Sequence, residues 1–165
     1  MDPTYRLPLG TPRDLYEKLQ REAARLTANV NGDNLFNFMV TAWHLQEWIG
    51  KGSPRTHPDF AADLTRLRTN PHVQICKDID DSSKHFRLDR RRRTVTDVTE
   101  RVIREPVHFG RSRVGNPRSG DENPLGEITL FVTVRNAAQE TTYGLRDLVD
   151  GVLRAYKVFA AKHPL

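Results

Sequence analysis

The segment that decides the fold is LFNFMVTAWHLQEWI, residues 35–49. Drawn as a helix, it is apolar around most of its circumference, which is typical of a helix buried at the centre of a bundle or of a dimer. The sequence predicts that this helix starts after Asp33 or Asn34 and runs to Ile49, with Gly50 placed to end it. We expect other helices to pack around it and two chains to pair as a homodimer through their apolar helices.

Helix signals also occur on both sides of this segment. Thr11 offers an N-cap hydroxyl, and Pro12 suits the first position of a helix. This helix is expected to stop at the turn residues Ala28–Gly32. Apolar spacing and prolines predict further helices, namely a short one opened by Pro58-Asp59-Phe60 and closed by Thr69-Asn70-Pro71, one from Pro71 to Phe86, and one from Leu145 to Lys162.

Strand signals gather in the second half of the chain. Ile128–Val134 is β-branched and alternating, and Glu140–Tyr143 could return as its hairpin partner. Thr94–Val98 leans towards strand, whereas Arg101–Phe109 fits a strand or a short helix equally well. Gly110–Glu127 is rich in Gly, Pro, Ser, Asn and Arg, and we interpret it as a long exposed loop, either mobile or functional.

Length and composition agree with one globular unit. The 165 residues fit a single domain, since domains most often have roughly 100–150 residues. The signals together predict a mainly α fold, with about five helices in a bundle and a small β-hairpin near the C-terminus. No run reaches the roughly 18–20 apolar residues of a membrane span, and residues 1–10 lack the features of a signal peptide. We therefore expect a cytoplasmic protein without a membrane partner.

The charge of the chain points to anionic partners. The formal net charge is +5 and the pI is about 9.7, so RNA, DNA or an acidic protein are plausible partners. Arginine forks grip phosphate well, and the best candidates for an anion-binding surface are the run Arg90, Arg91, Arg92 and Arg93 together with Arg111 and Arg113. A solubilising turn or a contact for an acidic protein partner explains the same run, so both interpretations stay open.

Familiar catalytic and cofactor motifs are absent from the sequence. It has no phosphate-binding P-loop, no dinucleotide-binding glycine fingerprint, no zinc-protease motif and no nucleophile elbow, so we predict no cofactor. Cys76 is the single cysteine, which excludes an intramolecular disulfide and a multi-cysteine zinc site. His44 and Glu47 stand at i, i+3, but without a second such pair we predict no metal site.

A polar stripe crosses the apolar central helix. At 100° per residue, Asn37, Thr41 and His44 fall within an arc of about 60°. These side chains could form the wall of a cleft in which His44 faces a second histidine, His85. They could equally satisfy one another or a neighbouring backbone by hydrogen bonds, as buried polar groups must.

The segment 76–86 carries the second candidate group. A histidine with a near-neutral pKa beside a carboxylate can move protons at pH 7, and His85 shares a helix flank with Asp78. Lys84 and Arg87 lie close enough in sequence to hold a phosphate. A surface histidine at a frayed helix end is the plainer interpretation of the same residues.

The same segment also shows lysine–aspartate pairing. At i, i+4 spacing, Lys77 pairs with Asp81 and Asp80 pairs with Lys84. Apolar residues such as Val73 follow the other face of the expected helix. The paired face is therefore expected to be a solvated surface.

Two segments resemble HEPN-like proteins of bacteria and phages, namely NFMVTAWHLQEW at residues 37–48 and CKDIDDSSKHF at residues 76–86. The resemblance implies a helical domain that commonly dimerises and often acts as an RNase in toxin and antiviral systems. It implies RNA binding or metal-independent RNA cleavage, with His85 as general acid/base, Lys84 and Arg87 on the phosphate, and Asn37 or His44 lining the cleft.

The chain departs from that pattern in its catalytic motif. Active members of the group carry an arginine a few residues before the histidine in one helix. Here Lys77 precedes His85 at a longer spacing, and Pro71 interrupts the better-spaced pair Arg66 and His72. A catalytically degenerate relative is thus equally compatible with the sequence, as is a non-catalytic homodimeric module that binds an acidic protein through the arginine-rich segment.

Overall fold

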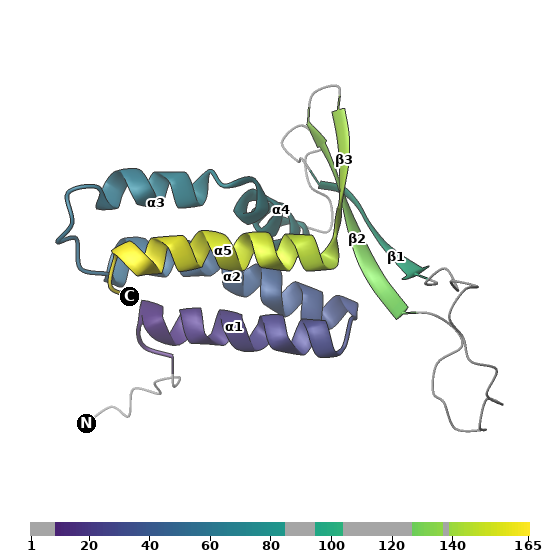
Figure 1. The fold of residues 1–165 in the computed structure, drawn as a ribbon, viewed down its shortest axis with the longest axis horizontal. Coiled ribbons are helices and arrows are strands. Elements are labelled where there is room, and N and C mark those ends of the chain that lie inside the picture. The colour runs from purple at the N-terminus through teal and green to yellow at the C-terminus, as the bar shows by residue number, and fades with distance from the viewer. Residues whose placement is uncertain (1–8, 85–94, 104–126, 137–138) are drawn as a thin grey trace, which may run out of the picture.

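A computed structural model describes residues 9–84, 95–103, 127–136 and 139–165. The described residues form five helices and a three-stranded antiparallel sheet that stands at one end of the helices (Figure 1). The mainly α fold with a hairpin near the C-terminus is therefore confirmed. None of the described helices combines the length and the apolarity that crossing a membrane requires.

The first helix, α1 (Pro12–Ala28), begins where its sequence signals predict. The Thr11 hydroxyl accepts a hydrogen bond from the Asp14 amide (3.1 Å), and the Asp14 carboxylate accepts one from the Thr11 amide (2.9 Å). This reciprocal capping box satisfies two amides that have no partner within the helix. Leu19 and Leu26 are then fully buried on its inner face.

The central helix, α2 (Gly32–Gly52), is longer than predicted. Its N-cap is Asn31, whose side chain accepts a hydrogen bond from the Asn34 amide (2.8 Å). Gly50 does not end the helix. A Cβ atom at Gly50 would lie 2.8 Å from Nη2 of Arg68 and 3.4 Å from Cδ2 of Leu64, so the glycine lets the Arg68 side chain pack closely against the helix.

The remaining helices are α3 (Phe60–Arg68), α4 (Pro71–Lys84) and α5 (Leu145–Lys162). Their sequence ranges agree with the predictions, and α3 and α4 meet at the predicted junction. The final two residues predicted for α4, His85 and Phe86, lie outside the described residues.

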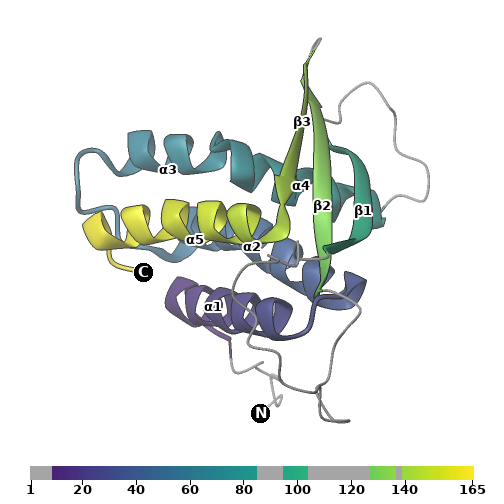
Figure 2. The same cartoon turned by 45° about the vertical axis from the view of Figure 1, so that its right-hand side comes forward.

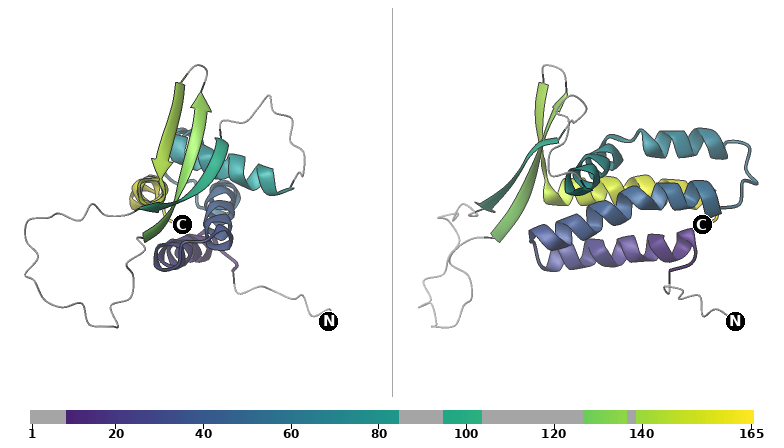
Figure 3. Two further views of the ribbon diagram at one scale, coloured as in Figure 1. Left: turned by 90° about the vertical axis from the view of Figure 1, so that its right-hand side faces the viewer. Right: turned by 180° about the vertical axis from the view of Figure 1, so that it is seen from behind.

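The core forms around α2, which packs against α1, α3 and α4 (Figure 3). Phe38, Leu45 and Ile49 are completely buried there. Tyr156 of α5 is also completely buried, and its hydroxyl donates a hydrogen bond to the Ala42 carbonyl. Burial of this apolar area is the main stabilising term of the fold, and the tyrosine bond fixes α5 against α2.

The sheet consists of β1 (Val95–Ile103), β2 (Glu127–Asn136) and β3 (Gln139–Gly144) in the order β1–β2–β3. The β2–β3 pair is the predicted hairpin, and α5 follows β3 directly (Figure 2). Pairing with β2, for example Val98 opposite Val132, makes a strand of a stretch whose local sequence is ambiguous. Residues 104–126, which contain all of the predicted loop except Glu127, lie outside the described residues, and Glu127 is instead the first residue of β2.

Candidate functional site

His44 of α2 lies beside a buried carboxylate on α4. Its Nε2 is 3.5 Å from Oδ1 of Asp80, and its Nδ1 is 3.7 Å from Oε2 of Glu47. The His44 side chain is 35% exposed, that of Glu47 43%, and that of Asp80 only 1%. One ring nitrogen thus faces an interior carboxylate, while the other faces a partly exposed carboxylate and solvent. A partly exposed histidine beside a carboxylate is suited to accept and return protons.

Packing between α2 and α4 positions this pair. The sulfur atoms of Met39 and Cys76 are 3.3 Å apart in the core, and Nζ of Lys77 lies 5.8 Å from the centroid of the Trp43 ring. Asp80 follows Cys76 by one helical turn, which brings its carboxylate to the level of His44. The pair is therefore set by two packed helices and not by a loop.

The position of Asp80 corrects one prediction. Asp80, predicted on the solvated face of α4, is buried at 1% exposure, and Asp78, predicted beside His85, is buried at 7%. The reason is tertiary packing, because α4 contacts α2, α3, α5 and β1. A helix covered on several sides buries residues that its own periodicity would place at the surface.

The polar stripe of α2 divides between two neighbouring helices. Thr41 is buried, and its hydroxyl accepts a hydrogen bond from Nζ of Lys18 on α1 (2.8 Å). His44 instead faces α4, whereas Asn37 is exposed and precedes His44 by two helical turns, or about 10 Å. Of the stripe, the structure brings only His44 to a carboxylate of another helix.

The other predicted site residues are not described in enough detail to be placed in a site. Lys84 is the last residue of α4, one helical turn beyond Asp80, and its side chain is outside the described part of the structure. The remaining predicted site residues lie entirely outside the described part of the structure, namely His85, Arg87, Arg90, Arg91, Arg92, Arg93, Arg111 and Arg113. Their roles stay predictions.

A groove of about 440 Å³ between α3 and α5 was not predicted. Its lining includes Arg66, His72, Arg154, Val158 and Lys162. Burial lowers the pKa of His72, and the positive charge of Arg154 lowers it further. No local sequence pattern predicts this groove, because its residues come from three helices that meet only in the folded chain.

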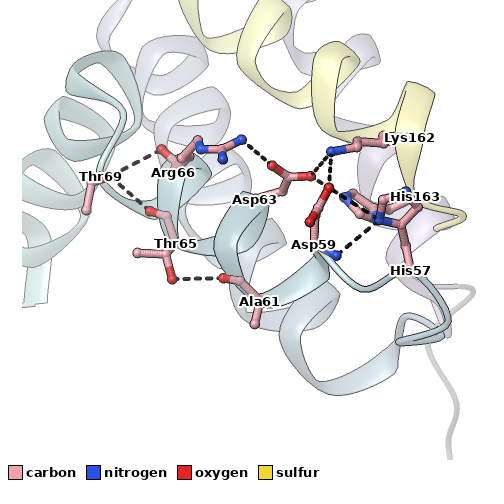
Figure 4. A network of polar contacts seen from close by, with 9 residues as sticks. All are labelled: His57, Asp59, Ala61, Asp63, Thr65, Arg66, Thr69, Lys162 and His163. Atoms are coloured by element: carbon pink, nitrogen blue, oxygen red, sulfur yellow. Dashed lines mark hydrogen bonds and ion pairs between the residues drawn. The ribbon is translucent and has the colours of Figure 1, made fainter.

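A network of charged side chains borders the groove and ties α5 to α3 (Figure 4). Asp63 is its centre, accepting hydrogen bonds from Arg66 (2.5 Å) and Lys162 (2.8 Å), while its Oδ2 lies 2.9 Å from Nε2 of the buried His163. Lys162 also reaches Asp59 (3.0 Å). The hydrogen bonds from Lys162 and His163 lower the pKa of Asp63 from 3.8 to about 2.

Ionised Asp63 is expected to stabilise the fold in a pH-dependent way. A carboxyl with a depressed folded pKa contributes stability above its unfolded pKa of about 3.8, and that contribution disappears as the pH falls towards about 2. In thermal unfolding at pH 6, Asp63→Asn should therefore have a lower melting temperature than the wild type. The difference between the two melting temperatures should disappear as the pH falls from 4 to 2. Asp150→Asn, on the exposed face of α5, should leave the melting temperature nearly unchanged throughout. A gap for Asp63→Asn that persists to pH 2 would contradict the assignment.

Cys76 has a structural role in this region. It is fully buried between α2 and α4, and burial raises the pKa of its thiol far above the ordinary value. A thiol in that state is a poor nucleophile. Cys76 therefore belongs to the packing between α2 and α4.

Within residues 9–84, 95–103, 127–136 and 139–165, no group of three or more His, Cys, Asp or Glu residues is arranged to hold a metal ion. Comparisons with protein-family models, curated proteins and solved structures found no match for this chain.

Proposed function

We propose that this chain binds RNA and cleaves it without a metal ion, as a HEPN-like protein of a defence or toxin-type system. The observation that supports the proposal is the His44–Asp80 pair, a partly exposed imidazole 3.5 Å from a buried carboxylate. The helix that supplies Asp80 ends at Lys84, and the sequence continues directly into His85, Arg87 and the arginine run.

The proposed reaction is a transesterification, in which the phosphoryl group moves from the 5′-oxygen of one nucleotide to the ribose 2′-oxygen of the preceding one. His44 takes the proton of a ribose 2′-OH, and the 2′-oxygen forms a bond to the adjacent phosphorus. The bond from phosphorus to the 5′-oxygen of the next nucleotide breaks, and that oxygen receives a proton from His85. The products are a 2′,3′-cyclic phosphate and a free 5′-OH, and each histidine ends with the proton state that the other began with.

The burial of the two ring partners distinguishes the two nitrogens. Asp80 is buried and its Oδ1 lies 3.5 Å from Nε2, so its negative charge favours the imidazolium that forms when His44 gains a proton. The substrate therefore approaches Nδ1, where the surface carboxylate of Glu47 can move aside. Lys84, Arg87 and Arg90–Arg93 supply positive charge for the phosphates.

The test is a cleavage assay on mixed cellular RNA in the presence of a chelator, with wild type and His85→Ala side by side. We expect the wild type to cleave and the variant to be slower by about 100-fold or more. Products should carry a 2′,3′-cyclic phosphate, which end-specific ligation detects. Intact RNA with both proteins would contradict the proposed nuclease activity. Unchanged cleavage by His85→Ala would contradict the proposed role of His85.

A non-catalytic homodimeric module is the second candidate. Phe36, Val40 and Trp43 lie within an arc of about 60° on α2, and Phe36 is 39% exposed. An exposed aromatic beside two half-buried apolar residues is a feature of protein interfaces. In this role the arginine-rich segment would bind an acidic protein. A stable dimer in sedimentation equilibrium, together with intact RNA, would favour this candidate.

A further inference from the structure

The groove between α3 and α5 has an apolar floor and charged edges. Leu67, Ala155 and Phe159 form part of the floor, with Val158 beside them. Val158 is 68% exposed, although large aliphatic side chains are usually covered. The volume of about 440 Å³ lies in the range of roughly 300–1,000 Å³ that is common for small-molecule sites.

The charge balance of the groove is positive. Lys162 and Arg66 are held by Asp59 and Asp63, so those two cations and two carboxylates neutralise one another. Arg154 is exposed on α5 and makes no ion pair within the part of the chain that the structure describes. The positive charge of Arg154 is therefore available to a ligand in the groove.

His72 lines the groove together with Arg154, and burial and the positive charge of Arg154 both lower the pKa of the His72 imidazole. The close approach of its ring explains Gly151, because a Cβ atom there would lie 2.5 Å from Cδ2 of His72. The other side of the ring meets Tyr143 edge-on, with centroids 5.6 Å apart. The ring is thus held in place, and it lines the groove beside the guanidinium of Arg154.

We propose that this groove binds a small organic anion that has an apolar body and one carboxylate, sulfonate or phosphate group. Arg154 takes the anionic group, since a guanidinium offers paired donors to such oxygens. The apolar body covers Val158 and Ala155 and removes their side chains from water. The site shares no residue with the His44–Asp80 pair, so it stands whether or not RNA is cleaved.

The probe for this site is 8-anilinonaphthalene-1-sulfonate, an aromatic anion whose fluorescence rises in apolar surroundings. Titration of the folded wild-type protein should give saturable binding at one site. Its neutral parent, 1-anilinonaphthalene, should bind about tenfold more weakly, because it lacks the charged group that Arg154 holds. Equal affinity for both probes would overturn the proposal, as would the absence of saturable binding.

Matched variants locate the site. Arg154→Gln should weaken binding of the sulfonate about tenfold, while Arg146→Gln, on the same helix but outside the groove, should leave it unchanged. Val158→Asp should weaken binding and Val158→Lys should not, and both replace an exposed side chain that the fold does not need. Thermal melts confirm that each variant is folded. Sulfonate binding that is unchanged in Arg154→Gln and in Val158→Asp would place the probe elsewhere and overturn the proposal.

Discussion

RNA cleavage is expected to slow by about 100-fold or more when His44 is replaced by alanine, because the 2′-OH then has no base beside it. His44 is partly exposed and lies above the core, so the variant should remain folded. RNA binding, measured by fluorescence anisotropy, should change little, since the proposed reaction assigns the phosphates to other residues. A His44→Ala protein that cleaves at the wild-type rate would exclude His44 as the base.

In the proposed reaction, Asp80 acts through His44 and is therefore a positioning residue. Asp80→Asn keeps the shape of the side chain but removes the charge that stabilises the imidazolium. We expect kcat to fall by about tenfold to 100-fold while KM changes little. A loss of activity that comes with a lowered melting temperature would indicate a structural role instead. Glu47→Gln, at the exposed ring nitrogen, should stay within about threefold of the wild type.

Helix ends and the hairpin could be predicted because their signals are local. The capping box at Thr11 and Asp14, the turn after Ala28 and the alternating strand Ile128–Val134 each determine structure within a few residues. The structure confirms α1 and α5 at the predicted bounds and extends the strand to Glu127–Asn136. These elements need little help from distant contacts.

The features that could not be predicted depend on contacts between distant residues. Gly50 suggests a helix end in sequence, but it is a site where Arg68 packs against α2. The segment Val95–Ile103 becomes a strand through its pairing with β2. Helix and strand propensities are weak enough for such contacts to override them.

The candidate site shows the same limit. His44 stands out in sequence as a polar residue on an apolar helix, but its partner could not be identified. Asp80 has a lysine at i+4, which is the usual sign of a surface ion pair. Its burial follows from the way α4 is enclosed by other elements. A pair of residues drawn from two helices leaves no spacing pattern in the chain.

The polar cluster between α1 and α2 gives the largest expected effect on stability. Glu22 is 3% exposed, and its Oε1 accepts hydrogen bonds from Lys18 and Arg25, both at 2.9 Å. Burial alone would raise the pKa of Glu22, but these two cations outweigh it and hold the pKa below the ordinary value of 4.5. Lys18 also donates to Thr41, so its ammonium joins the two helices.

Lys18→Met is expected to lower the free energy of unfolding by about 2–3 kcal/mol, because it leaves a buried carboxylate with only one cation. The cost should shrink below pH 4.5, where protonation of Glu22 removes the charge that Lys18 compensates. Urea unfolding at pH 7 and at pH 4 measures both effects. The exposed pair Arg13–Glu17 supplies the control, since Arg13→Met should cost less than about 0.5 kcal/mol.

The double variant Lys18→Met with Glu22→Leu separates the charge from the packing. Replacing both partners removes the buried carboxylate together with its counterion and puts apolar side chains of similar volume between α1 and α2. We expect its stability to return to within about 1 kcal/mol of the wild type. If the double variant is instead as unstable as Lys18→Met alone, the loss lies in the hydrogen bond to Thr41 and the packing of the lysine stem, and the buried charge of Glu22 is not its cause.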